Sequence, residues 1–300
     1  MNISDASAGG PDEAFRQVAI VGLGLIGGSI ALAARRRWPG IRVVGIDRPA
    51  VLSSATARGA VTDSAVDLDG VADADLVILA TPVRHIVATI ERLPELAGFA
   101  AIVTDVGSTK RVVVEAASRV APRVTFVGGH PMAGAATSGF DSATADLFVG
   151  RRWLLTPAPD CPPWPLARLQ RFVSGLGARP SVIDAADHDR LMAAVSHLPQ
   201  VAASALMRVA GELAGADGLS LAGAGLRDTT RLASSPADVW ADICATNADH
   251  LGMAIDRYVE VLTSLRSRLS ERPAVDAVFG PARDWRHELE IVVSGGRSLA

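Results

Sequence analysis

The sequence is poor in cysteine and in aromatic residues. Of its 300 residues only two are cysteines, Cys161 and Cys244, and they lie far apart without forming a CxxC pair. We therefore expect no disulfide framework and no metal site, and two isolated thiols are typical of a reducing cytoplasm. Aromatic residues make up 4% of the chain, so the core must be built from Ala, Val, Leu and Ile.

The chain also lacks an excess of charge and a long uninterrupted hydrophobic run. Its net charge is -3, from 29 basic and 32 acidic residues, which gives no electrostatic footprint for nucleic acid or an anionic membrane. The most apolar stretch, 18–34, is broken by four glycines and is shorter than the ~20 residues that a membrane span needs. With 49% apolar and 20% charged residues, we expect a globular cytoplasmic protein without nucleic-acid or membrane partners.

Apolar runs alternate with helical patterns from Val18 to about Asp184. Strands that are apolar at every position indicate a parallel sheet covered on both faces, so this half is predicted to be a doubly wound, Rossmann-type domain. The expected strands are 18–21, 42–46, 76–80, 101–104, 125–127 and 181–183.

From Ala185 onward the strand patterns stop, and long alanine-rich helices are predicted over 191–214, 238–245 and 248–269. The second of these carries apolar residues on more than one face, which predicts a homodimer through an all-α C-terminal domain. The predicted organisation is a flexible leader (1–16), a dinucleotide-binding domain (17–184), a helical substrate and dimerisation domain (185–272) and a C-terminal tail (273–300).

A glycine-rich fingerprint follows the first predicted strand. Gly22 allows a tight turn, Gly24 lets a pyrophosphate approach the backbone, and Gly27 lets helix and strand pack closely. Asp47 follows 20 residues after Gly27 and would bind the adenosine ribose, so NAD is predicted over NADP, although Arg48 could pair with a 2′-phosphate. The cofactor site is expected to include also Leu25, Ile26, Thr81, Pro82 and Val106.

A histidine follows another predicted strand, in the segment GGHPMAG. Proline restricts the residue before it to extended conformations, so Pro131 holds His130 in a set pose on a rigid loop. Its imidazole suits proton abstraction from a substrate hydroxyl while hydride leaves. Lys110 is expected to be a surface residue without a chemical role. His188, between two aspartates, is expected on a solvated helix face and not in a metal site.

The segments VAIVGLGLIGGSIA, TDVGSTK, GGHPMAG, SHLPQ and RDTTRLASSPADVWADI together resemble the prephenate/arogenate dehydrogenase family of tyrosine biosynthesis, from about Val18 to Leu269. The resemblance implies an NAD-dependent oxidative decarboxylation of prephenate to 4-hydroxyphenylpyruvate. In that reaction hydride leaves C4, the 4-hydroxyl loses its proton, and CO2 departs as the ring becomes aromatic.

The resemblance also implies roles for single residues. His130 would hydrogen-bond the 4-hydroxyl, Ser108 would lie near that hydroxyl and the nicotinamide, and Arg231 would anchor a substrate carboxylate. His197 and Trp240 would line the substrate pocket. The chain departs from many relatives at Gln200, where they carry a second histidine that contacts the side-chain end of the substrate.

Four other functions remain open at this stage. Gln200 leaves an arogenate dehydrogenase possible, and an amino-deoxyprephenate dehydrogenase would use the same motifs. β-Hydroxyacid dehydrogenases share this domain arrangement but use a lysine on a helix, and the helical half of this chain has none. A nucleotide-sensing binding protein would not need Ser108, His130 and Arg231 together.

Overall fold

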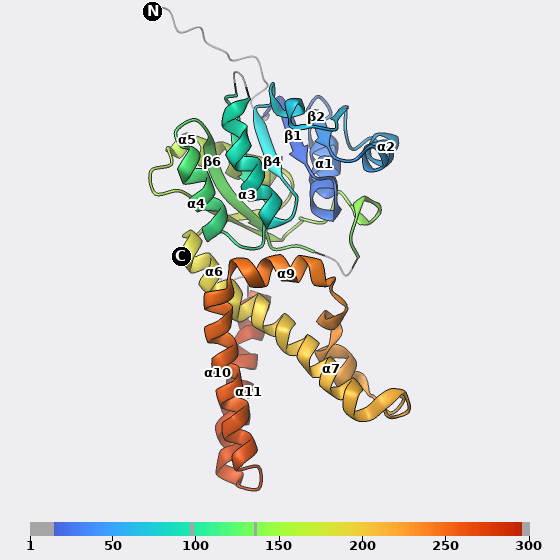
Figure 1. Ribbon diagram of the computed structural model, residues 1–300, viewed down its shortest axis with the longest axis vertical. Coiled ribbons are helices and arrows are strands. Elements are labelled where there is room, and N and C mark those ends of the chain that lie inside the picture. The colour runs from blue at the N-terminus through green and yellow to red at the C-terminus, as the bar shows by residue number, and fades with distance from the viewer. Residues whose placement is uncertain (1–14, 97–98, 135–136, 296–300) are drawn as a thin grey trace, which may run out of the picture. The chain divides into compact units, whose positions relative to one another are not determined.

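The protein is described by a computed structural model over residues 15–96, 99–134 and 137–295. These residues form two compact units, one reaching to Ala248 and the other beginning at Asp249. The first unit contains one eight-stranded sheet with helices on both faces (Figure 1). The predicted boundary at 184 falls between the last strand and the first helix of the C-terminal half. It stays a prediction, because the next helices belong to the same unit as the sheet.

The sheet confirms the predicted doubly wound class. Its strand order is β3-β2-β1-β4-β5-β6-β7-β8, and all neighbours are parallel except β6 and β7. Two strands, β3 and β7, were not predicted, and β6 extends further than expected. The strands are β1 (Gln17–Val21), β2 (Arg42–Ile46), β3 (Asp63–Ala65), β4 (Leu76–Leu79), β5 (Ile102–Asp105), β6 (Thr125–Pro131), β7 (Arg152–Pro157) and β8 (Arg179–Val182).

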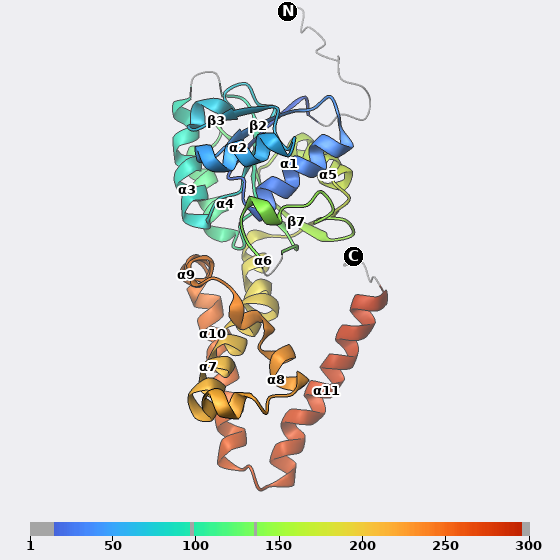
Figure 2. The ribbon, with the colours of Figure 1, turned by 90° about the vertical axis from the view of Figure 1, so that its right-hand side faces the viewer.

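Two helical layers cover the sheet and bury its central strands, as Figures 1 and 2 show. One layer holds α1 (Leu25–Arg37), α2 (Pro49–Ala57) and α5 (Pro163–Gly175), and the other holds α3 (Val83–Arg92) and α4 (Arg111–Val120). Each fully buried Val, Leu or Ile side chain contributes about 1.5–3 kcal/mol to this packing. Short 3₁₀ turns lie at Leu68–Val71, Leu93–Glu95 and Phe140–Ser142.

The few aromatic residues of the first unit are concentrated in its core. Trp38 stacks on Phe172 with ring centroids 5.2 Å apart, and Phe15 meets the same ring edge-on at 5.7 Å. Phe15 is 2% exposed, so its assignment to a flexible leader was wrong. The burial of Phe15 is not evident from the sequence, because one aromatic residue in a polar segment gives no periodic signal. Residues 1–14 of the predicted leader lie outside the described part of the chain.

The helices that follow the sheet differ from the prediction in their boundaries. The helix expected over 191–214 is two helices joined by a π-helical turn, and Gly215 interrupts the second with a φ of +62°. The elements are α6 (Ala185–Met192), the π turn η4 (Ala193–His197), α7 (Leu198–Leu219), α8 (Ala224–Thr229), the 3₁₀ turn η5 (Arg231–Ser234) and α9 (Ala237–Thr246).

The second unit consists of α10 (Ala248–Ser267) and α11 (Arg272–Gly295). The predicted tail at 273–300 is therefore wrong as far as Gly295, and its last five residues lie outside the described chain. Pro273 was predicted to end a helix, but it lies in the first turn of α11. The N–H groups of a first helical turn have no partner within the helix, so a proline there loses no hydrogen bond and favours the start of a helix.

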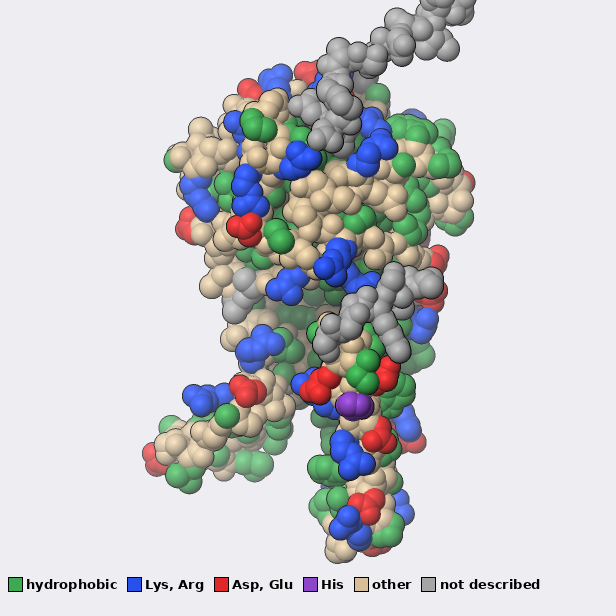
Figure 3. Space-filling model, turned by 180° about the vertical axis from the view of Figure 1, so that it is seen from behind, with side chains coloured by type: hydrophobic (Ala, Val, Ile, Leu, Met, Phe, Trp, Pro, Cys, Tyr) green, Lys and Arg blue, Asp and Glu red, His purple; other side chains and the backbone are tan. Residues whose placement is uncertain are grey.

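Several large apolar side chains of these helices are exposed, including Met253, Phe279 and Trp285, and green hydrophobic side chains lie among charged ones on the surface in Figure 3. Within the described residues, no helix combines the length and apolar character that crossing a membrane requires.

Candidate active site

The glycine fingerprint forms an open turn between β1 and α1. A Cβ at Gly22, whose φ is +94°, would lie 2.7 Å from the carbonyl oxygen of Ala80, and one at Gly27 would lie 1.9 Å from that of Gly22. By contrast, apart from its neighbours along the chain, no heavy atom of the described residues lies within 4 Å of a Cβ placed on Gly24. The first and third glycines therefore permit close packing, while the second leaves the backbone accessible to a ligand.

The amino end of α1 lies at this turn and fits an anion. No side chain caps it, and its first turn holds no acidic residue. The first N–H groups of a helix lack intrahelical partners and carry a partial positive charge, so they attract phosphate. Leu25 and Ile26, both half-buried, supply the first residues of this turn.

Asp47, at the end of β2, is fixed beside the same turn. Its carboxylate accepts hydrogen bonds from the backbone N–H of Leu23 at 2.7 Å and of Arg48 at 2.6 Å. The Arg48 side chain is 87% exposed and lies 3.8 Å from that carboxylate. The structure thus fixes the acid beside the glycine turn and leaves the arginine largely in solvent.

The other predicted cofactor residues lie at the carboxyl ends of the neighbouring strands. Thr81 follows β4, and its hydroxyl is buried without a hydrogen-bond partner among the described residues. Pro82 beside it is exposed, and Val106, after β5, donates its N–H to Leu79 at 3.1 Å. The chain crosses from one side of β1 to the other here, which is where doubly wound sheets bind nucleotides. A buried hydroxyl without a partner and an open glycine turn fit a dinucleotide.

A buried ion pair joins the ends of β5 and β6. Lys110 is the only lysine of the chain and is fully buried, so its placement on the surface was wrong. Its ammonium pairs with Asp105 and donates to the carbonyl oxygen of Gly129 at 2.8 Å. Asp105 also accepts the N–H groups of Gly107 (2.8 Å) and Gly129 (3.0 Å). Burial lowers the pKa of Lys110, and the Asp105 carboxylate opposes that shift.

His130 lies within strand β6 and not on the loop that was predicted to follow it. The strand reaches this far because the two glycines before His130 have no side chains, so adjacent segments of the protein can approach its backbone closely. A Cβ at Gly128 would lie 2.1 Å from the Thr156 hydroxyl, and one at Gly129 would lie 2.5 Å from the Asp105 carbonyl oxygen. Pairing with β7, where Leu154 is opposite His130, fixes the backbone of the histidine.

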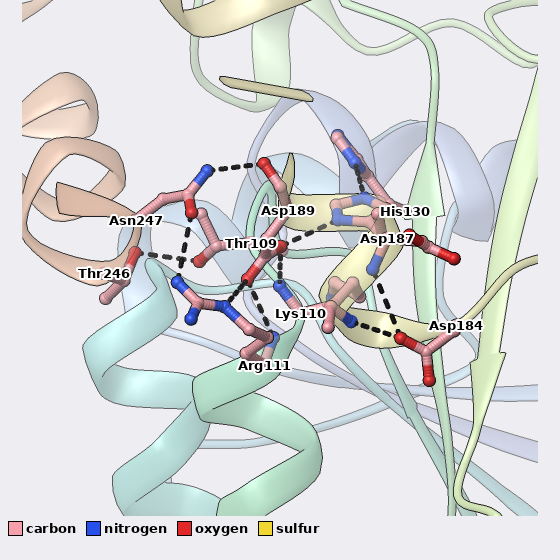
Figure 4. A network of polar contacts seen from close by, with 12 residues as sticks. Thr109, Lys110, Arg111, His130, Asp184, Asp187, Asp189, Thr246 and Asn247 are labelled. Carbon is pink, nitrogen blue, oxygen red and sulfur yellow. Dashed lines mark hydrogen bonds and ion pairs between the residues drawn. The ribbon is translucent and has the colours of Figure 1, made fainter. Parts of the chain in front are cut away.

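The imidazole of His130 contacts a second histidine (Figure 4). Nδ1 of His130 lies 2.8 Å from Nε2 of His188, and Nδ1 of His188 lies 2.8 Å from Oδ1 of Asp189. His188 and Asp189 are fully buried, so their expected place on a solvated face was wrong. Of the three residues 187–189, only Asp187 lies on a solvated face: its side chain is 57% exposed and pairs with Arg190.

Asp189 ties the sheet to the helices. Its carboxylate accepts the backbone N–H groups of Lys110 (2.7 Å) and Arg111 (2.9 Å) at the start of α4. Its carbonyl oxygen accepts a hydrogen bond from Nδ2 of Asn247 at 2.8 Å. Burial alone would raise the pKa of Asp189, but the hydrogen bonds from His188, Arg111 and Lys110 lower it, so the carboxylate is ionised.

His197 occupies the last position of the π turn and is almost fully buried. Its Nδ1 lies 3.3 Å from Nδ2 of Asn247, and its ring meets the half-buried Trp240 edge-on at 5.9 Å. Burial lowers the pKa of His197 to about 4, against the opposing charge of Asp189. A π turn inside a helix redirects the side chains that follow it and is frequent at functional sites.

His130 is neutral at physiological pH as well. Burial and the neighbouring His188, Lys110 and His197 hold the pKa of His130 well below its usual value. A neutral imidazole can accept a proton or a hydrogen bond, which is what a general base requires.

Gln200 is 5% exposed, and both ends of its amide contact protein groups. Nε2 donates to the carbonyl oxygen of Leu232 at 2.7 Å, and Oε1 accepts from the Ser235 hydroxyl at 3.2 Å. Gln200 thereby holds the segment that begins with the exposed Arg231. This structural contact was not predicted, and a contact of Gln200 with substrate stays a prediction.

Ser108 is half-buried in the turn between β5 and α4. The hydroxyl of its neighbour Thr109 lies 2.8 Å from that of Thr246 in α9. The catalytic roles predicted for Ser108 and His130 are supported by this position near the strand ends and stay proposals.

The structure links two predicted residues through three that the sequence analysis missed. His130 and His197 are connected through His188, Asp189 and Asn247. The sequence does contain one sign of His188 and Asp189: acidic and imidazole side chains follow the predicted strand 181–183, at the predicted domain boundary. That signal is ambiguous, because the same pattern is common on exposed helices.

Comparisons with known proteins place the chain beside one group of enzymes. The family model for the nucleotide-binding domain of prephenate dehydrogenase matches residues 30–182, and the model for its dimerization domain matches residues 184–277. The prephenate dehydrogenase of Bacillus subtilis is 34% identical over 286 residues, which cover 93% of this chain and 77% of that protein.

Two solved structures are similar over nearly their whole length. The prephenate dehydrogenase of A. aeolicus, in complex with hydroxyphenyl propionate and NAD+, has a TM-score of 0.83 and 30% identity, covering 91% of this chain and 98% of that one. The arogenate dehydrogenase of Synechocystis has a TM-score of 0.77 and 32% identity, covering 91% of this chain and 99% of that one.

We predict that Lys110→Met lowers the free energy of unfolding by about 3–5 kcal/mol, because it leaves Asp105 buried without its counter-charge. Adding Asp105→Asn should recover part of the loss. The control is Arg119→Met, which breaks exposed pairs with Glu91 and Glu115 and should cost at most about 1 kcal/mol. Urea unfolding measures all three, and a Lys110→Met variant as stable as the wild type would contradict the prediction.

Stability should also fall with acidification. Below the ordinary histidine pKa of 6.5 the unfolded chain binds a proton at His197 that the folded chain does not bind until about pH 4. The free energy of unfolding therefore drops as the pH falls from about 6.5 to about 4, by about 3 kcal/mol from this residue. Urea unfolding at several pH values should give a weaker pH dependence for His197→Gln than for the wild type, and equal slopes would exclude this cause.

Proposed function

Because the chain belongs to the prephenate dehydrogenase family, we propose that it converts prephenate to 4-hydroxyphenylpyruvate by NAD-dependent oxidative decarboxylation. The observation that carries this proposal is a neutral imidazole, His130, held in β6 at the same edge of the sheet as the glycine turn after β1. Neither half of that arrangement alone would distinguish a dehydrogenase from a nucleotide-binding protein.

The residues that would hold NAD are those of the open turn and the strand ends. Gly22, Gly24 and Gly27 and the start of α1 would receive the pyrophosphate, and Asp47 would receive the ribose hydroxyls. When bound, NAD supplies the hydride acceptor for the reaction. Thr81, with its partnerless buried hydroxyl, would contribute a polar contact at the end of β4.

His130 would take the proton of the substrate 4-hydroxyl as hydride leaves C4. Loss of CO2 then returns an electron pair to the ring, which leaves a phenolate oxygen that needs a proton. The reaction as a whole releases no proton, so the one held by His130 can return to that oxygen. Ser108, near the same strand ends, would help to orient the hydroxyl.

Binding of the substrate carboxylates would fall to the helical segments. Arg231 is exposed and begins η5, and its planar guanidinium suits a bidentate contact with a carboxylate. His197 and Trp240, in contact with each other, would line the pocket. Gln200 fits both prephenate and arogenate, because a neutral amide pairs with a keto acid or an amino acid.

The proposed assembly is a homodimer formed through the helical part, in keeping with the matched dimerization domain and the exposed apolar side chains of α10 and α11. We propose a cytoplasmic location because the two cysteines, Cys161 and Cys244, are free thiols, which are typical of a reducing compartment.

The central experiment is steady-state kinetics with prephenate and arogenate, each with NAD and NADP, on the wild type and His130→Asn. We expect turnover of prephenate with NAD, and a loss of roughly 10²–10⁴-fold in kcat for His130→Asn with little change in KM. Turnover of arogenate but not of prephenate would contradict the proposed substrate and show that the protein is an arogenate dehydrogenase. Normal turnover by His130→Asn would exclude His130 as the base.

The choice of cofactor depends on Asp47. NAD should give a higher kcat/KM than NADP, because the fixed carboxylate accepts ribose hydroxyls and repels a 2′-phosphate. Asp47→Ser should narrow or reverse the ratio of the two kcat/KM values. The matched control is Arg48→Ser, which should leave the NAD value unchanged; a wild-type preference for NADP would contradict the assignment.

A further inference from the structure

We propose that His188 and Asp189 are positioning residues that fix the tautomer of His130, with its proton on Nδ1 and its lone pair on Nε2. The proposal rests on the proposed function in one respect: there, the proton that His130 receives comes from the substrate 4-hydroxyl. It assigns a role to two buried residues, neither of which needs to touch the substrate.

The direction of the hydrogen bonds is set at Asp189. Its Oδ1 lies 2.8 Å from Nδ1 of His188, and the same carboxylate accepts the N–H groups of Lys110 and Arg111. An ionised carboxylate can only accept hydrogen bonds, so Nδ1 of His188 must carry its proton. Three donors around one buried group keep it ionised.

The tautomer of His188 then sets that of His130. Burial lowers the pKa of His188 despite the opposing hydrogen bond to Asp189, so His188 is neutral and its Nε2 holds a lone pair. That lone pair lies 2.8 Å from Nδ1 of His130. Two lone pairs cannot form this contact, so Nδ1 of His130 is the donor and its Nε2 is left as the acceptor.

The same hydrogen bonds, from His130 through His188 to Asp189, stabilise His130 when it is protonated. A cation on His130 keeps its Nδ1–H directed at His188, and the negative charge of Asp189 lies one residue further along. The other charged or titratable groups around the two rings are Lys110, Asp105 and His197, which come from the β5–α4 turn, from β5 and from η4. Lys110 is paired with Asp105, so Asp189 is the anion aligned with the rings.

The geometry argues against a purely space-filling role for His188. A side chain that only filled the core would need no polar contacts, whereas both nitrogens of His188 are engaged at 2.8 Å. Burying a polar ring costs free energy unless each group finds a partner, and an apolar residue would fill the same volume without that cost.

The first test is the tautomer of His130 by ¹⁵N NMR on histidine-labelled wild-type protein near pH 7, without substrate. The His130 signals are assigned by their absence in His130→Asn. We expect the proton on Nδ1. A proton on Nε2 would overturn the proposal, whatever the protein turns over.

The second test is a matched pair of variants. In His188→Gln the amide oxygen lies near the position of Nε2 and can still accept from His130. In His188→Asn the amide lies near the position of Nδ1, so the contact with Asp189 is kept and the acceptor for His130 is lost. Both variants replace the ring with a smaller amide, and Asn is one methylene shorter than Gln, so the thermal midpoints are measured to separate a packing defect from the loss of the acceptor.

We expect His188→Asn to lose about tenfold to hundredfold in kcat, the scale on which outer-shell partners of a histidine act. Its KM should match that of His188→Gln, which should retain most of the activity, and the missing methylene should lower its thermal midpoint only slightly. In His188→Asn the NMR signals of His130 should shift toward the Nε2–H form. Equal losses in both variants with an unchanged tautomer would mean that His188 is only structural and would overturn the proposal.

The two proposals fail differently. If the wild type does not oxidise prephenate or arogenate, the proposed function fails, and the substrate-free NMR measurement still decides the tautomer. If the wild type is active and His188→Asn is equally active, the tautomer proposal fails alone.

Discussion

The site depends on one buried charge pair, between Lys110 and Asp105. Its three hydrogen bonds to backbone groups tie together the end of β5, the turn before α4, and the part of β6 that carries His130. Taking two charges out of water is costly, and the pair offsets that cost through further hydrogen bonds to the backbone of Gly107 and Gly129. Such a pair tolerates few alternative arrangements, which suits a position beside His130, the proposed base.

The choice of lysine at this position is informative. Apart from histidine, every other basic residue of the chain is an arginine. An ammonium is compact and donates in three directions, so it fits between a carboxylate and a carbonyl oxygen in a fully packed interior. A guanidinium is larger and planar and is used elsewhere in this chain for exposed ion pairs, such as those of Arg119 and Arg208.

The second link is Asp189, which joins α6 to the start of α4 and, through Asn247, to the end of α9. It brings segments near positions 110, 130, 190 and 247 into one network, although they are widely separated in the sequence. The same network keeps His130, His188 and His197 neutral by burial. Neutral imidazoles can accept a proton or a hydrogen bond at neutral pH, and the associated cost is a loss of stability in acid.

The sequence by itself determined six of the eight strands and the glycine turn, and it singled out His130 as a candidate base. These features are encoded locally: apolar runs predict buried strands, glycine spacing predicts the turn, and a histidine before proline has few conformations. The family resemblance added Ser108, His197, Arg231 and Trp240, whose roles no local pattern could supply.

Only the tertiary structure decided which polar residues are buried. Lys110, His188 and Asp189 have the sequence context of exposed helical residues, and their burial follows from partners contributed by distant segments. The same holds for Phe15, which packs on Phe172, and for Gln200, which holds the segment of Arg231. A side chain's burial depends on what packs over it, and that information is not contained in the residues beside it in the sequence.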